Sequence, residues 1–205
     1  SDLINNKVFD PDDIEKKENI DVNKLFEIIY NGGMPELCSI KNMDRNMFFQ
    51  SYVNTYIERD VRKLINVGNI ETFKKFMRDM AIRNGHTLNY SDIANDVGVS
   101  APTIREWVSV LVSSRIIYLL EAYHNNKIDR LTHMPKIIFM DSGLASFLAG
   151  FTSSKELQLS ADSGNFLETY VVSEIIKSYD NNGLPLDISH FRNKETEEID
   201  LIMFK

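Results

Sequence analysis

The sequence predicts an α+β fold, because its helical and strand-like patterns occupy different parts of the chain. Apolar residues recur at helical spacing through most of residues 23–115. Runs rich in β-branched and aromatic residues follow at 116–120 and 136–140, and two strand-like segments close the chain at 187–192 and 197–204. The chain has 205 residues, of which 43% are hydrophobic and 26% charged, so it has enough apolar residues for a sizeable core.

The composition argues against a membrane-spanning protein, a secreted protein and a disulfide-bonded protein. No apolar run approaches the roughly 20 residues that span a bilayer, and the first residues lack the basic and apolar pattern of a signal peptide. The single cysteine, Cys38, excludes an internal disulfide and agrees with a reducing compartment. We therefore expect a cytoplasmic protein with no membrane partner.

The net charge of −7 is unevenly distributed. Residues 43–85 carry a net charge of +3 and residues 124–140 a net charge of +2, whereas residues 1–42 and 155–205 carry −4 and −5. Nucleic-acid binders concentrate positive charge on one face, because neutralised phosphates release counterions. Only the middle of this chain could form such a face, so strong non-specific binding of DNA is not expected.

Residues 1–22 are polar and acidic and are predicted to form a linker or arm, followed by a helical connector at 23–85. The clearest helix is expected at 44–66, where Asp44 can cap the N-terminus. Its inward face is predicted from apolar residues at steps of four, four, four and three: Phe49, Val53, Ile57, Val61 and Leu64.

Residues 86–142 show the outline of a winged helix-turn-helix. Asn89 is expected to cap a short helix and Ser100 a longer one, with Gly98 in the turn between them. The strands at 116–120 and 136–140 would follow, joined by a polar wing. In DNA readers the second helix reaches the bases, so Thr103 and Arg105 are candidate contacts for nucleic acid or a partner protein.

The wing adds three candidate cations, Lys127, Arg130 and Lys136, which could touch phosphate or another domain. Against a DNA role, the segment 89–115 has a net charge of −1, so docking of a protein is at least as well supported. Arg59, late in the long helix, is a candidate for an inter-domain contact.

Several stretches in order resemble a known family: Gly-Gly-Met-Pro-Glu at 32–36, Tyr-Ile-Glu-Arg-Asp-Val at 56–61, Asn-Asn-Lys at 125–127 through Arg130, Pro-Lys-Ile-Ile-Phe at 135–139, Asp-Ser-Gly-Leu at 141–144, Asn-Phe-Leu-Glu at 165–168 and Glu-Ile-Asp-Leu at 198–201. The series is similar to the domain of unknown function that follows the ATP-binding domain in bacterial and archaeal AAA+-type ATPases.

The resemblance implies an upstream ATPase domain, which would bind ATP and Mg²⁺, then the connector and the winged helix. It also implies that residues 143–205 form part of a PD-(D/E)XK nuclease-like α/β unit, truncated at the C-terminus. Glu168 would match the metal-binding acid of the helix in that fold, and Asp200 the acid of the strand. The Glu-X-Lys strand of the fold would fall beyond Lys205.

This chain contains no complete site for any reaction. Gly32-Gly33 is not followed by the Gly-Lys-Ser/Thr that cradles phosphate, and the histidines lack zinc-ligand spacing, so no cofactor is expected here. The function we expect is a regulatory or interaction module of an ATPase, with the winged helix engaging DNA or a protein partner such as the upstream ATPase domain. The alternative is an incomplete metal-dependent nuclease, in which Glu168 and Asp200 lie close together.

Overall fold

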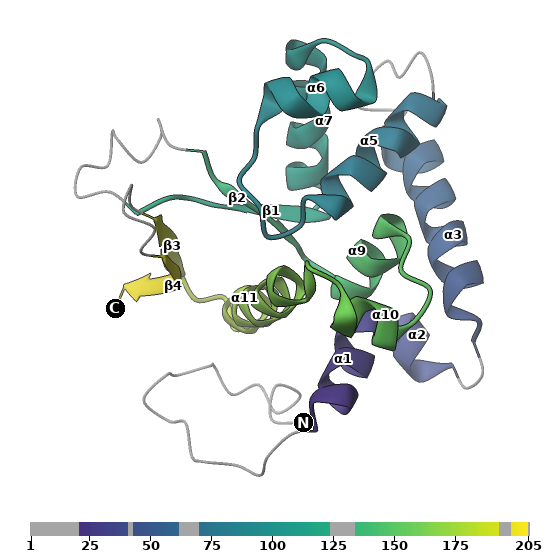
Figure 1. Ribbon diagram of the computed structural model, residues 1–205, viewed down its shortest axis with the longest axis vertical. Helices are drawn as coiled ribbons and strands as arrows, with labels where there is room; N and C mark the ends of the chain where they lie inside the picture. The colour runs from purple at the N-terminus through teal and green to yellow at the C-terminus, as the bar shows by residue number, and fades with distance from the viewer. Residues whose placement is uncertain (1–20, 41–42, 62–69, 124–133, 193–197, 205) are drawn as a thin grey trace.

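The computed structural model describes residues 21–40, 43–61, 70–123, 134–192 and 198–204. Its elements have the following bounds (Figure 1): α1 Val22–Asn31, α2 Pro35–Ser39, α3 Arg45–Tyr56, a π-helical turn Ile57–Val61, α5 Ile70–Ile82, α6 Tyr90–Val97, α7 Ala101–Ser113, β1 Ile117–Leu120, β2 Lys136–Phe139, α9 Ser142–Ala149, α10 Ser154–Leu159, α11 Ser163–Asn181, β3 Asp187–Arg192 and β4 Glu198–Phe204. The fold mixes helices with two small antiparallel sheets, which confirms the α+β class.

Short polar side chains begin the helices where the sequence predicts. A carboxylate oxygen of Asp44 accepts a hydrogen bond from Met47 N at 2.9 Å, and the Asn89 side chain accepts one from Ser91 N at 3.0 Å. The Ser100 hydroxyl accepts from Thr103 N at 3.3 Å. Gly98 ends α6 with φ of 87°, a left-handed conformation that costs glycine little.

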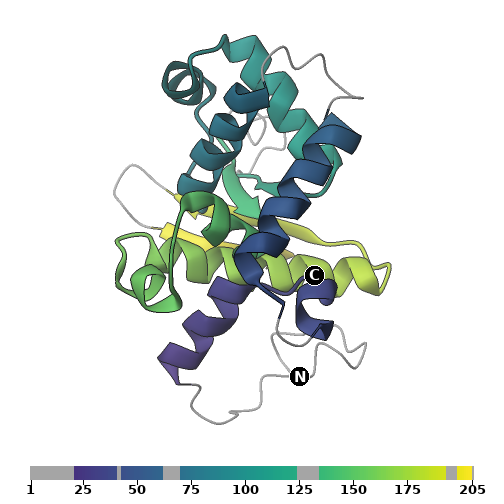
Figure 2. The same cartoon turned by 90° about the vertical axis from the view of Figure 1, so that its right-hand side faces the viewer.

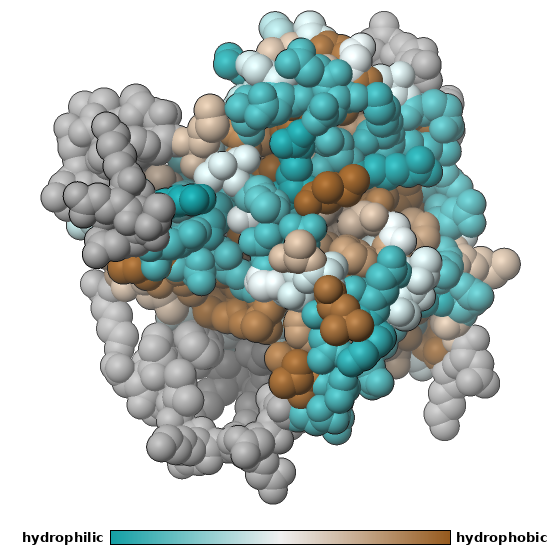
Figure 3. Space-filling view, viewed as in Figure 1, coloured by the Kyte–Doolittle hydropathy of each residue, from teal (hydrophilic) through white to brown (hydrophobic). Residues whose placement is uncertain are grey.

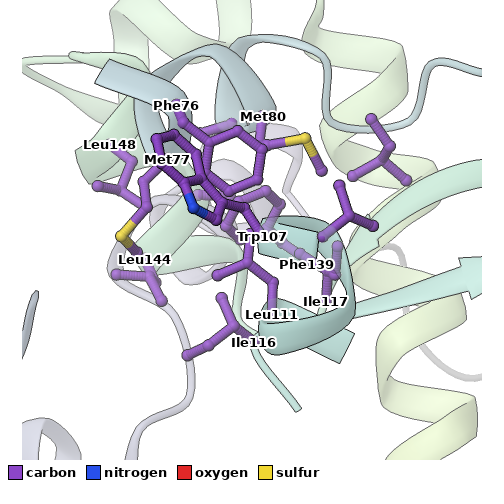
Figure 4. Close-up of a cluster of buried hydrophobic side chains, with 14 of the residues drawn as sticks. Phe76, Met77, Met80, Trp107, Leu111, Ile116, Ile117, Phe139, Leu144 and Leu148 are labelled. Carbon is purple, nitrogen blue, oxygen red and sulfur yellow. The ribbon is translucent and has the colours of Figure 1, made fainter. Parts of the chain in front are cut away.

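The main core lies where α5, α7 and α9 meet the β1–β2 pair (Figure 4). Trp107 packs its ring 5.1 Å from that of Phe73 and 5.4 Å from that of Phe76, measured between centroids. Apolar residues at helical spacing predict one inward face for each helix of this region, and the structure buries those residues: Phe73, Phe76, Met77 and Met80 in α5, Ile93, Ala94 and Val97 in α6, and Ile104, Trp107, Val108 and Leu111 in α7.

The inward faces of two other helices differ from the sequence prediction. In α1 the apolar spacing predicts that Leu25, Ile28 and Ile29 face inward, but the structure buries Phe26 and Ile29 and leaves Ile28 42% exposed. In α11 the spacing predicts a buried Val171, which is 45% exposed. α1 packs mainly on α9 and α10, so its contact surface is rotated toward Phe26. The short helices α2 and α10 were not predicted.

The two sheets meet through one parallel bridge. β1 pairs antiparallel with β2, and β3 pairs antiparallel with β4. Just beyond β1, Ala122 forms a parallel bridge with His190, supported by a 3.0 Å hydrogen bond from His190 N to Glu121 O. On the other edge of β2, Thr87 bridges to Lys136 and Leu88 N donates to Pro135 O at 2.8 Å.

β4 carries an extra residue relative to β3. The register runs from Phe191 opposite Ile199 to Ser189 opposite Ile202, so three steps in β4 match two in β3. Beside this irregularity Leu201 and Met203, two positions apart, pack against the second apolar cluster, which is formed by Leu120, Ile138, Val172, Ile176 and Ile188.

Two of the glycine-containing stretches noted in the sequence meet in space. A Cβ on Gly143 would lie 2.4 Å from Asn31 O, so the turn after α1 and the start of α9 touch backbone to backbone. Asp141 joins them by accepting hydrogen bonds from Gly33 N at 2.9 Å and Leu144 N at 2.7 Å. Arg45 completes the junction by donating to Gly143 O at 3.0 Å and stacking over the Tyr30 ring.

The helix α11 lies against β2, and α1, α9 and α10 gather beside its first turns (Figures 1 and 2). Within the described part of the chain, no helix has the length and apolarity that a bilayer span requires. The elements therefore place the start of β2, the N-terminal half of α11 and β4 around one point.

Candidate functional site

Lys136, the first residue of β2, lies at that point. Its side chain is only 5% exposed, and its ammonium nitrogen contacts three carboxylates. The distances from Lys136 Nζ are 2.8 Å to Glu168 Oε1, 2.9 Å to Glu198 Oε1 and 3.4 Å to Asp200 Oδ1. We call these four residues the Lys136 cluster.

Secondary-structure periodicity explains why these groups meet. Side chains alternate along a strand, so Lys136 and Ile138 point to the same face of β2, the face that packs on α11. In α11, Glu168 lies one turn before Val172, so the two share a face of the helix. The Lys136 cluster therefore lies on the same faces of β2 and α11 as the second apolar cluster.

The structure brings Glu168 and Asp200 together, as the sequence predicted. One oxygen of each carboxylate lies within hydrogen-bonding range of the same nitrogen, so the two oxygens are far closer than the 10 Å that would have refuted their proximity. Their assignment as metal ligands stays a prediction.

The electrostatics of the Lys136 cluster follow from its burial. Burial of the ammonium lowers the pKa of Lys136, but its hydrogen bonds to Glu168 and Glu198 outweigh this effect and the pKa is raised. Burial raises the pKa of Glu168, and the Lys136 bond offsets this only in part. The same ammonium lowers the pKa of Glu198 by hydrogen bonding. At neutral pH Lys136 is the cation that the acids surround.

His190 is a second titratable group beside the cluster. Its side chain is buried in β3, where the residue is 3% exposed. Burial lowers the pKa of His190, and the positive charge of Lys136 lowers it further. The imidazole is therefore neutral at neutral pH, and it adds no second positive charge next to Lys136.

The arrangement does not fit a divalent metal. Carboxylates are suitable ligands for Mg²⁺, but the Lys136 ammonium already lies between the three oxygens that would bind it. Among the residues that the structure describes, no group of three His, Cys, Asp or Glu side chains has the geometry to hold a metal ion. What the cluster can do is join three elements through one buried cation.

Lys136 was predicted to be an exposed contact of the wing, and this prediction is wrong. Its burial and its three carboxylate partners leave no donor facing solvent for a phosphate. The other two candidates of the wing, Lys127 and Arg130, lie outside the described residues.

The remaining candidate contacts lie elsewhere on the surface. Thr103 shares a 2.7 Å hydrogen bond with the Ser100 hydroxyl at the start of α7. Arg105 is exposed and lies over the Tyr90 ring, 5.1 Å from its centroid. Arg59 is exposed in the π-helical turn, far along the chain from the Lys136 cluster.

Two members of this site, Glu198 and His190, were not among the residues predicted from the sequence. The alternation of Glu198 with Asp200 was a usable signal, since two carboxylates two positions apart fall on one face of a strand. A further signal was the position of Lys136 at the head of an apolar run, Ile-Ile-Phe at 137–139, whose members are all buried.

Comparisons with known proteins agree with a bacterial family of unknown function. The chain is 23% identical over 171 residues to two uncharacterised proteins, Mb2031c of Mycobacterium bovis and Rv2008c of Mycobacterium tuberculosis. These residues are 83% of this chain but 38% of each relative, so the chain spans well under half of their length. No solved structure matches it.

Two family models match successive parts of the chain. Residues 163–205, which contain α11, β3 and β4, match a domain of unknown function (DUF4143). Residues 22–155 match another domain of unknown function (DUF8612), and this match covers more than half of the chain. The chain therefore belongs to the DUF8612 family, with a DUF4143 segment after it.

Proposed function

We propose that this chain is an interaction module in the C-terminal part of an AAA+-type ATPase, and that its winged helix docks a protein surface. The partner we favour is the ATPase domain of the same polypeptide. The observation that carries the choice of protein over DNA is the charge of the exposed α6–α7 face.

The ATPase context is supported by the match of residues 163–205, because DUF4143 is known as a C-terminal region of AAA-type ATPases. The mycobacterial relatives are long enough to contain another domain besides the part that matches this chain. The chain itself carries no phosphate-binding loop, so ATP and Mg²⁺ would be bound in the other domain.

The winged-helix assignment is supported by the order and pairing of the elements. Three helices, α5, α6 and α7, precede the strands β1 and β2, and the segment 85–88 lies between α5 and α6. That segment pairs with β2, which pairs with β1 on its other edge. A helix-turn-helix followed by a β-hairpin would present α7 as its second helix.

The surface over α6 is mainly hydrophilic (Figure 3). The exposed residues of α6 and α7 carry little positive charge. Asp92, Asp96 and Glu106 are exposed there, and Arg105 is the counter-charge among the described residues of the two helices. Arg83, which could add a second positive charge, donates to Asp79 and Asp96. A polyanion would meet repulsion at this face, whereas a protein with basic side chains would not.

The Lys136 cluster supports the same function from inside the fold. It ties β2, which ends the winged-helix arrangement, to α11 and β4 of the DUF4143 segment. Such a buried connection would hold the two matched segments in one orientation when either one docks. The convergence of Glu168 and Asp200 is what favours a metal-dependent nuclease as the second candidate, and the position of Lys136 opposes it.

Two binding measurements test the proposal. Fluorescence anisotropy with a labelled random duplex should show no saturable binding below about 10 μM at near-physiological salt. Calorimetry with the ATP-binding part of the parent polypeptide should show saturable binding that Glu106→Gln weakens, because it removes one of the exposed acids that a basic partner would meet. The matched control is Glu27→Gln, which removes an exposed acid from α1, away from this face.

Tight duplex binding that Arg105→Ala abolishes would overturn the choice of a protein partner. Cleavage of the duplex that depends on both Mg²⁺ and Glu168 would favour the nuclease instead.

A further inference from the structure

A small hollow lies where α3, α5 and α9 meet, on a part of the molecule that the Lys136 cluster does not involve. Its volume is about 170 Å³, which is too little for a nucleotide. The residues that line it are Gln50, Val53 and Asn54 of α3, Lys74 and Arg78 of α5, and Phe147 and Leu148 of α9.

The walls of this hollow differ in chemistry according to the helix that supplies them. Lys74 and Arg78 are one helical turn apart, so both cations face the hollow from α5. Gln50 and Asn54 are likewise one turn apart and face it from α3. Val53 and Leu148 are buried beneath them, and they give the hollow an apolar floor.

Most of its polar groups have no partner. Within the described part of the chain, Arg78 forms no ion pair, and the side-chain amides of Gln50 and Asn54 form no hydrogen bond. Lys74 pairs with Glu71 at 3.2 Å, but that carboxylate is 78% exposed, so the pair is weak. An anion entering the hollow would meet donors that nothing inside the fold satisfies.

The positive charge of this hollow distinguishes it from another hollow of the molecule. A second open hollow, beside α6, is lined by Asp79, Asp92, Asp96 and Asp162 and would repel an anion. The α3–α5–α9 hollow thus combines two cations with an apolar floor, a pairing that suits a carboxylate on or next to an apolar side chain.

We propose that the α3–α5–α9 hollow binds an acidic peptide segment of a partner protein. A carboxylate of the peptide accepts hydrogen bonds from Arg78 and Lys74, and a neighbouring apolar side chain rests on Val53 and Leu148. The amides of Gln50 and Asn54 are placed to bond the backbone of the peptide. This site is separate from the α6–α7 face and does not depend on the docking proposed for it.

The test uses the whole 205-residue chain and a labelled, doubly capped eight-residue peptide with four glutamates and two leucines. Anisotropy at low salt should show saturable binding that weakens as salt is added, because the cations are near the surface. Arg78→Gln should weaken binding about tenfold, the usual cost of losing one charged hydrogen bond. Lys155→Gln, which removes the same charge from α10, should leave binding within about twofold.

Three results would overturn this proposal. The first is equal binding by Arg78→Gln and Lys155→Gln. The second is equal binding of a peptide with glutamine in place of each glutamate. The third is Arg78-dependent binding of duplex DNA without binding of the peptide, which would make the ligand a phosphate. Unfolding curves of both variants should match the wild type, since Arg78 is exposed and has no described partner to lose.

Discussion

At the scale of single residues, Gly143 shows how closely the turn after α1 approaches α9. A Cβ at Gly143 would lie 2.4 Å from Asn31 O, which is backbone and cannot rotate away. Gly143→Ala should therefore lower the free energy of unfolding by about 1–3 kcal/mol, as overpacking does in other cores. Urea denaturation followed by circular dichroism measures the change.

The matched control is Gly164→Ala, in α11. A Cβ at Gly164 meets nothing within 4 Å, so alanine should be neutral there or stabilise by up to about 1 kcal/mol through its helix propensity. Equal stability of the two variants would mean that the backbones of Asn31 and Gly143 are not in contact.

His190 makes the stability of the fold sensitive to pH. Its pKa is lowered by burial and then by Lys136, whereas a histidine of the unfolded chain titrates near about 6.5. Between these two values the unfolded chain binds more protons, so stability should fall as the pH drops below about 6.5. Melting temperatures from pH 7.5 to 5 should show this fall in the wild type.

The comparison that isolates this effect is His190→Gln, in which the fall should be smaller. Glu168, whose pKa is raised, acts in the opposite direction but is present in both proteins. Parallel pH profiles for the two proteins would contradict a buried neutral His190.

Local rules predicted the residues whose roles depend on near neighbours in the sequence. Asp44, Asn89 and Ser100 cap their helices as expected, because a cap bonds an amide two or three residues away. Lys136 could not be placed in this way. Its partners lie 32 and more positions away, and a lysine at the head of a strand is normally solvated.

At the scale of elements, the Lys136–Glu168 pair joins β2 to α11, with side chains 5% and 11% exposed. Lys136→Met should lower the free energy of unfolding by about 3 kcal/mol, because it leaves Glu168 buried without its counter-charge. Adding Glu168→Leu to that variant should restore part of the loss, since the double change removes both buried charges.

Asp200→Asn is the control for this cycle, because the Asp200 side chain is 63% exposed and its ion pair is screened by water. Its effect should stay within about 1 kcal/mol. A larger loss in Asp200→Asn than in Lys136→Met would mean that burial does not govern the cluster.

Helical periodicity predicted the buried face of α5 and α7 correctly, because each of these helices packs one broad stripe against the core. Periodicity wrongly predicted that Ile28 of α1 and Val171 of α11 are buried. These helices have more apolar residues than positions that contact a neighbouring element. Only the packing partners decide which of several apolar residues is inside, and those partners are set by tertiary structure.

At the scale of the whole molecule, two apolar cores share the β1–β2 pair. One core holds the helices that match DUF8612, and the other lies between β2 and α11. The sequence indicated the order of these parts and the proximity of Glu168 to Asp200. It could not reveal the bridge from Ala122 to His190 or the bulge in β4, since neither has a local signature.

Lys136 is the cation that the three carboxylates surround, and we propose on this ground that the cluster joins three elements of the fold and does not bind a metal. Thermal unfolding of the wild-type chain with and without about 10 mM Mg²⁺ tests it most directly, because a ligand that binds the folded state raises the melting temperature. We predict that Mg²⁺ leaves the melting temperature unchanged, both in the wild type and in Asp200→Asn. A saturable rise with Mg²⁺ in the wild type that Asp200→Asn abolishes would contradict the claim.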